Sequence, residues 1–301
     1  MKITNNKHTQ PKFNGRLKSI NALNPISYYT NRYMKKSARL SQTHIQKIIP
    51  ELEGKIKIVD IKKGKNLKIS AWDINPKNSD SYVIFLHGMA QNISEYQQLY
   101  KTILEKKLGV FAVEYRGYGS NPKSTLSENK LRKDIESAYE YLTKNKKIKP
   151  QNIILIGHSM GGALATNFAT KHKDLKALIL ICPIYNVQNL GKKFMTHKKI
   201  GEGIPNYIMK LTECIKPLAW LHSLRFSTGR KIEHVKTPTY LLQSTNDSVT
   251  TIDNAKIIAS KTKKSNILED FAIFETGGHK VDNQKIQKIA EYLDLINNHN
   301  T

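Results

Sequence analysis

Short apolar runs alternate with amphipathic stretches along most of this chain. The apolar runs cover residues 82–88, 110–115, 152–157, 177–183, 239–244 and 271–275, and stretches with helical periodicity cover 93–107, 127–146, 160–171, 251–262 and 282–297. A strand that is apolar on both faces needs helices to cover both faces, and this alternation supplies them. The pattern therefore predicts a doubly wound α/β domain with a mostly parallel sheet.

Two further segments define the expected organisation of the domain. Residues 55–74 hold two alternating runs, KIKIVDI and LKISAWDI, separated by the turn residues Lys65 and Asn66, which predicts an N-terminal β-hairpin. About 50 residues lie between the runs ending at Pro183 and starting near Thr239, which is too long for an ordinary connection. Their apolar fragments predict a small helical cap at about 184–231, inserted into one domain that spans 51–301.

The charge balance of the chain is strongly basic. Lys and Arg total 49 against 24 Asp and Glu among 301 residues, which gives a formal net charge of +25 and suggests a nucleic-acid or anionic-membrane partner. However, 42 of the 49 are Lys, whereas bidentate recognition of phosphate and guanine relies on Arg. The Lys excess also accompanies abundant Asn and Ile, so we interpret the charge as mainly compositional and disfavour nucleic acid.

Residues 1–50 differ from the rest of the chain because they hold ten basic residues and no acidic ones. They have no sustained apolar periodicity, which predicts a partly disordered extension that could contact an anionic membrane peripherally. No run approaches the ~18–20 apolar residues of a spanning helix, and the N-terminus has no apolar signal region. Cys182 and Cys214 could pair, but two cysteines in a chain of this length more often remain free thiols in a reducing compartment, so a cytoplasmic location is predicted.

The segment Gly157-His158-Ser159-Met160-Gly161 carries the main chemical signal of the sequence. It matches G-x-S-x-G and lies between an apolar strand and a predicted helix, where a sharp turn lifts the serine hydroxyl out of the sheet. Small residues two positions before and after the serine leave room for that turn. Ser159 is therefore the predicted nucleophile.

A serine hydroxyl needs a histidine base and a carboxylate that orients the histidine. Asp247 directly follows the run 239–244, and His279 directly follows the run 271–275, so both are expected at carboxyl ends of strands, as is Ser159. We predict Asp247 as the acid and His279 as the base. Asp253, in the first turn of the next helix, and Glu275, on the strand before the histidine loop, are weaker candidates.

The remaining histidines receive other interpretations. His158 is expected to be a packing residue and His87 a structural residue of the His-Gly turn, and the other histidines form no metal-ligand spacing. The oxyanion hole is expected to consist of the backbone amides of Met89 and Met160, with Gly88 allowing the tight turn that presents Met89.

These motifs resemble the α/β-hydrolase superfamily over nearly all of 52–301, in particular its short-cap serine hydrolase branch. That branch includes bud-emergence-type hydrolases, acyl-protein thioesterases and serine aminopeptidase-like proteins. The segments that carry the resemblance are FLHGMAQNIS, EYRGYGSN, IGHSMGGALA, TPTYLLQSTNDSVT and ETGGHK. Glu114 stands where the pattern usually has Asp, and we expect it to brace its loop.

The resemblance implies hydrolysis through an acyl-enzyme, without a metal or organic cofactor. We expect a carboxylesterase, a lysophospholipase or acylglycerol lipase, or an acyl-protein thioesterase, acting on a small or lipid-like acyl substrate. A serine aminopeptidase is the nearest alternative, but residues 184–231 offer only Glu202 and Glu213 against nine basic residues for binding a substrate ammonium. A different alternative is a binding protein that keeps the fold and uses its basic tail on anionic lipid or nucleic acid.

Overall fold

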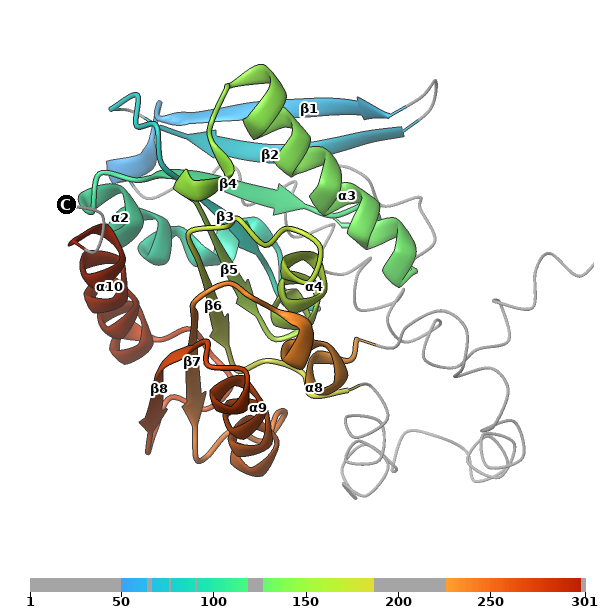
Figure 1. Ribbon diagram of the computed structural model, residues 1–301. Helices are drawn as coiled ribbons and strands as arrows, with labels where there is room; N and C mark the ends of the chain where they lie inside the picture. The colour runs from blue at the N-terminus through green and yellow to red at the C-terminus, as the bar shows by residue number, and fades with distance from the viewer. Residues whose placement is uncertain are drawn as a thin grey trace, which may run out of the picture.

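The computed structural model describes residues 50–63, 67–75, 77–89, 91–118, 127–186 and 226–298 (Figure 1). The predicted N-terminal extension, apart from Pro50, and the central part of the predicted cap, 187–225, lie outside these residues. Within the described ranges, every helix is too short or too polar to cross a bilayer.

The core of the fold is an eight-stranded sheet in the order β1-β2-β4-β3-β5-β6-β7-β8. Its strands are β1 (Ile56–Lys63), β2 (Leu67–Ile74), β3 (Tyr82–Leu86), β4 (Gly109–Glu114), β5 (Ile153–His158), β6 (Ala177–Ile181), β7 (Thr239–Ser244) and β8 (Leu268–Phe274). β1 and β2 form the expected hairpin, β2 pairs antiparallel with β4, and all other neighbouring strands are parallel. The predicted doubly wound, mostly parallel sheet is confirmed.

Helices cover both faces of the sheet (Figure 1). One face carries α2 (Gln97–Glu105) and α10 (Asn283–Asn298), and the other carries α3 (Glu128–Glu140), α4 (Met160–Ala169), α8 (Thr228–Lys231) and α9 (Ile252–Lys264). Every residue of β3, β5 and β6 is buried, which explains why these strands read as continuous apolar runs rather than as alternating patterns.

The helix boundaries depend on caps. The stretch predicted as one helix over 93–107 begins as a 3-10 turn, η4 (Ile93–Tyr96), because Asn92 and Glu95 form a capping box. The stretch 127–146 ends in a π-helical turn, η5 (Tyr141–Asn145). The remaining short turns are η3 (Pro50–Leu52), η6 (Pro150–Asn152) and η8 (Ile232–His234).

β8 begins three residues before the predicted run, at Leu268, because it is an edge strand. Its first part contains Glu269 and Asp270, which interrupt the apolar pattern, and an edge strand tolerates such polar side chains. β1 is the opposite edge strand of the sheet, and its exposed Ile58 likewise departs from the rule that apolar residues are buried.

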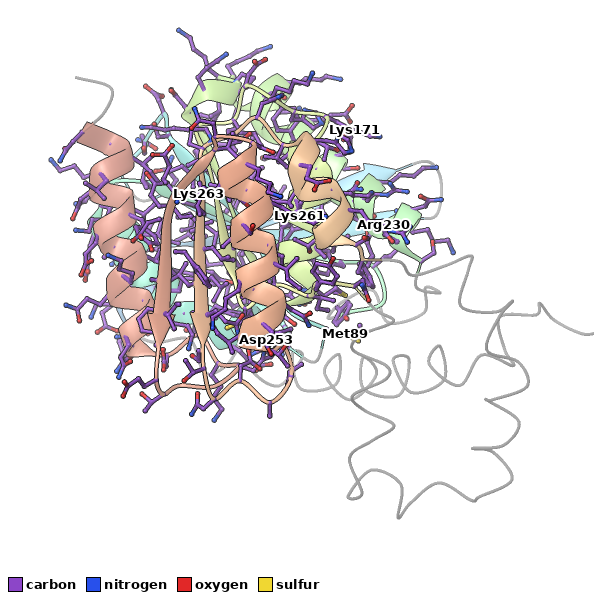
Figure 2. All side chains as sticks on the ribbon, turned by 60° about the horizontal axis from the view of Figure 1, so that its bottom comes forward. Met89, Lys171, Arg230, Asp253, Lys261 and Lys263 are labelled. Carbon is purple, nitrogen blue, oxygen red and sulfur yellow. The ribbon has the colours of Figure 1, made fainter. Side chains whose placement is uncertain are left out.

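The parallel strands bring their carboxyl ends to one edge of the sheet. The loops after β3, β5, β7 and β8 all lie there, and they carry His87, Ser159, Asp247 and His279. Figure 2 shows Met89, from the loop after β3, and Asp253, at the start of α9, toward this end, with Lys263 at the opposite end of α9. Open α/β sheets bind ligands at this edge.

Candidate active site

Ser159 occupies a sharp turn between β5 and α4. Its backbone has φ 55° and ψ −114°, a strained conformation for a residue with a side chain. The flanking glycines make this turn possible: a Cβ on Gly157 would lie 2.4 Å from the Gly161 carbonyl oxygen, and a Cβ on Gly161 would lie 2.0 Å from the Leu86 carbonyl oxygen. The close approach of backbones explains why both positions need glycine.

Ser159, His279 and Asp247 lie together in one hydrogen-bonded line. Ser159 Oγ is 2.9 Å from His279 Nε2, and His279 Nδ1 is 2.8 Å from Asp247 Oδ2. Because an ionised carboxylate only accepts, Nδ1 carries the proton and Nε2 is left to accept from the serine hydroxyl. Asp247 follows Ser159 by 88 positions, and His279 follows Asp247 by 32 positions. The fold therefore brings distant residues together with the donor and acceptor directions that a nucleophile and its base require.

The Asp247 carboxylate is held by its own loop. Its Oδ1 accepts from the backbone N–H groups of Val249 (2.7 Å) and Thr250 (2.9 Å), and its Oδ2 accepts from Thr250 Oγ1 (2.8 Å) and Gln243 Nε2 (3.1 Å). Burial raises the pKa of Asp247, but hydrogen bonds and charge from His279, together with Thr250, outweigh burial and hold that pKa well below its usual value. The carboxylate is thus ionised and fixed in direction.

The Asp247 and His279 loops are also joined to each other. Asn246 accepts a hydrogen bond of 2.9 Å from the Gly278 N–H through its side-chain oxygen, and the Thr245 N–H donates to the Phe274 carbonyl over 2.8 Å. These bonds connect the end of β7 to the end of β8, so the loops of the acid and the base are held to each other.

The loop after β3 lies directly against the nucleophile. A Cβ on Gly88 would be 3.4 Å from Ser159 Cβ and 3.3 Å from His158 Nδ1, so the absence of a side chain allows this approach. Gly88 does not adopt a positive φ, so the close approach of the loop, rather than a left-handed backbone, is what calls for a glycine here. Tyr118 Oη donates to the Met89 carbonyl over 2.8 Å and fixes the residue predicted to supply one oxyanion amide.

Met160, predicted to supply the second amide, is the first residue of α4. The first amides of a helix have no partner within the helix and point outward from its positive end. The two predicted donors therefore come from the loop after β3 and from the start of α4, which both adjoin Ser159.

The two weaker acid candidates are exposed, and His87 is a buried residue of the loop after β3. Asp253 is exposed in the first turn of α9, and Glu275 is exposed directly after β8. His87 is fully buried between the Tyr115 and Tyr118 rings, and burial lowers its pKa to about 4. Such a histidine stays neutral and braces its loop, in agreement with a structural role.

His158 makes contacts that its sequence position does not reveal. Burial, and then the nearby charge of His279, lower its pKa to about 3, so the ring is neutral. Its two nitrogens face Tyr96 and the backbone of His279. In the sequence, the one hint of these contacts is that position 158 holds a polar histidine where packing alone would accept an apolar residue.

Cys182 lies beside Asp247 and His279. Its sulfur, an Asp247 oxygen and a His279 nitrogen lie within 4.8 Å of one another, which is compatible in spacing with a metal site. Burial, and then the Asp247 charge, raise the pKa of the Cys182 thiol far above its ordinary range, so the thiol beside the predicted base is protonated. The carboxylate and imidazole are engaged with each other, and we interpret this group as part of the serine site.

Glu114 ends β4 and is buried. Its Oε1 has no hydrogen-bond partner among the described residues, so the expected bracing of the loop is not found at that oxygen. Burial raises the pKa of Glu114 to about 7.

A sequence profile described as serine aminopeptidase S33 matches residues 77–222. A Mycoplasma pneumoniae protein that is named as an esterase/lipase is 31% identical over 116 residues, which is 38% of this chain and 42% of that protein. The chain thus spans less than half the length of that relative. A protein of Acanthamoeba polyphaga mimivirus, named as an α/β hydrolase, is 29% identical over 231 residues, covering 74% of this chain and 78% of that one.

Solved structures share the fold. The structure of an esterase from Pyrococcus furiosus superposes with a TM-score of 0.65 at 19% sequence identity, covering 82% of this chain and 90% of that chain. The sheet order, the strand-turn-helix around Ser159 and these likenesses define one class of protein. The chain has the α/β-hydrolase fold, and it is similar in sequence to proteins named as esterases and α/β hydrolases.

Proposed function

We propose that this protein is a serine hydrolase that cleaves an ester or thioester bond through an acyl-enzyme. The observation that carries the proposal is the line of hydrogen bonds from Ser159 Oγ through His279 to Asp247, with distances of 2.9 and 2.8 Å. This is the geometry by which a base activates a hydroxyl nucleophile.

In the proposed reaction, Ser159 Oγ attacks the carbonyl carbon of the substrate while His279 Nε2 takes the hydroxyl proton. Asp247 keeps the proton of His279 on Nδ1 and stabilises the imidazolium that forms. The backbone amides of Met89 and Met160 donate to the oxyanion of the tetrahedral intermediate. His279 then returns its proton to the leaving alcohol or thiol. In the second half of the reaction, water attacks the acyl-enzyme while His279 takes its proton, and His279 then returns that proton to Ser159 Oγ as the acid product leaves.

The names of the relatives support ester chemistry over peptide chemistry. One relative is named as an esterase/lipase and one solved structure is that of an esterase, whereas the matching sequence profile is named for an aminopeptidase. An aminopeptidase needs a carboxylate that binds the substrate ammonium, and the predicted cap, 184–231, contains nine basic residues and only two acidic ones. We therefore place ester or thioester cleavage first and a peptidase second.

The test combines substrate choice with removal of the nucleophile. The full chain is assayed with p-nitrophenyl esters of increasing acyl length, with an acyl thioester and with aminoacyl p-nitroanilides. We expect hydrolysis of the esters, and a loss of at least ~10³-fold in kcat for Ser159→Ala without a change in thermal midpoint. Faster cleavage of the anilides would favour the peptidase, and retained ester turnover by Ser159→Ala would refute the assignment of the nucleophile.

A further inference from the structure

His158, the residue before the predicted nucleophile, connects three loops of the site. Its Nδ1 lies 2.8 Å from Tyr96 Oη, in the turn η4, and its Nε2 lies 2.8 Å from the backbone carbonyl oxygen of His279. The His158 and His279 rings are 5.0 Å apart between centroids. The side chain is 1% exposed, so no bulk water competes for these bonds.

The proton positions follow from counting donors. A carbonyl oxygen only accepts, so the His158 nitrogen that faces His279 must carry a hydrogen. A neutral imidazole has one N–H, which leaves Nδ1 bare to accept from the Tyr96 hydroxyl. Tyr96 Oη in turn accepts from the Gly88 N–H over 3.3 Å, and the structure places Gln91 Oε1 as an acceptor for the Tyr96 hydroxyl.

The hydroxyl of Tyr96 has a single proton, which this scheme gives to His158. Because the hydroxyl cannot also donate to Gln91 Oε1, the scheme requires the Gln91 amide to be flipped relative to its placement in the structure, so that its NH₂ group faces Tyr96 as a donor. Every group in the chain from Gln91 to His279 is then satisfied with one arrangement of protons.

The backbone before His279 explains why such a bond is needed. Gly277 and Gly278 have φ values of 87° and 52°, and a Gly-Gly pair has the largest conformational freedom of any dipeptide. The strand that precedes them, β8, is an edge strand paired on one side only. The imidazole of His279 is held by Asp247, whereas its main chain is held by the N–H of His158.

We propose that His158 is a positioning residue that sets the place of the base by holding the main-chain carbonyl of His279, and couples it through Tyr96 to the Gly88 amide of the oxyanion loop. This inference rests on the proposed function, because it concerns the same reaction. A packing residue would need only the shape of the ring, whereas this role needs the Nε2–H donor.

The test compares two substitutions at one position in the full-length protein. His158→Gln keeps an N–H donor that can reach the His279 carbonyl, and His158→Leu removes it at similar volume. Initial rates are measured with p-nitrophenyl acetate, and active sites are counted by a fluorophosphonate probe. We expect kcat per site to fall about 10–100-fold for His158→Leu with KM within about two-fold, because a displacement of about 1 Å costs rate at this scale, and to recover at least about five-fold in His158→Gln.

A control separates positioning from loss of stability. Ile135→Ala, in the buried face of α3, a helix that carries none of the predicted site residues, is expected to lower the thermal midpoint but to keep kcat per active site. Equal kcat values for His158→Leu and the wild type, or equal losses in His158→Leu and His158→Gln, would overturn the inference. Failure of the proposed function looks different, because the wild type itself would then neither hydrolyse the ester nor react with the probe.

A measurement on the unaltered protein keeps the inference testable if His158→Leu does not fold. Nitrogen-15 NMR of the imidazole groups distinguishes the tautomers. We expect His158 to be neutral at pH 6, with the proton on Nε2 and a bare Nδ1. A neutral ring with its proton on Nδ1 and a bare Nε2 would remove the donor and overturn the inference.

Discussion

A buried carboxyl at the end of β4 gives a quantitative prediction for the pH dependence of stability. Glu114 is 7% exposed, and its Oε1 has no hydrogen-bond partner among the described residues. Replacement by Gln keeps the size of the side chain but removes the titrating group. We therefore compare the free energy of unfolding of the wild type and Glu114→Gln across pH.

The magnitude follows from the raised pKa. Burial raises the pKa of Glu114 from 4.5 to about 7 in the folded protein, so the folded state binds more protons than the unfolded state between these values. Stability contributed by this group is therefore present below pH 4.5 and lost as pH rises through 7. The wild type should lose roughly 2–3 kcal/mol relative to Glu114→Gln between pH 5 and pH 8.

Urea unfolding at several pH values measures this difference directly, because titrations shared by the two proteins cancel. Glu275→Gln is the matched control, since Glu275 is exposed and solvated in both states. A difference between the wild type and Glu114→Gln that does not change with pH from 5 to 8 would refute the reasoning, and would mean that Glu114 has a compensating partner or contact with water.

Three other substitutions test separate parts of the account. Asp247→Asn should lower kcat about 10⁴-fold by loss of the required His279 tautomer, and a loss under ten-fold would contradict the role of the acid. Asp134→Ala, which leaves the buried Arg116 guanidinium without its carboxylate, should cost about 3–5 kcal/mol in urea unfolding, and a cost below about 1 kcal/mol would refute this. Gly161→Ala should abolish ester hydrolysis because its Cβ would lie 2.0 Å from the Leu86 oxygen, and near wild-type kcat would show that the turn relaxes.

The arrangement of strands and helices could be predicted because local patterns and global fold agree. β3, β5 and β6 are buried on both faces and read as continuous apolar runs, and the hairpin β1–β2 reads as alternation. The extent of β8 was harder to predict, because an edge strand need not exclude polar residues. The start of a predicted helix differed where a capping side chain accepts from the first amides, as Asn92 does before η4.

The site residues could be placed because parallel strands bring their carboxyl ends together. That rule places Ser159, Asp247 and His279 at one edge of the sheet from sequence order alone. The partners of His158 could not be predicted, because Tyr96 and the His279 carbonyl are distant in sequence and reach His158 only through the three-dimensional fold. The isolation of Glu114 was hidden for the same reason, since a sequence does not reveal which buried oxygen lacks a donor.

The covalent intermediate is the most direct test of the central claim. The full chain is mixed with a p-nitrophenyl ester, quenched with acid within the first turnover, digested and analysed by mass spectrometry, with Ser159→Ala treated in parallel. The account predicts a burst of p-nitrophenol and the acyl mass on the peptide that contains Ser159, absent from the variant. An acyl group on another residue, or the same burst from Ser159→Ala, would contradict it.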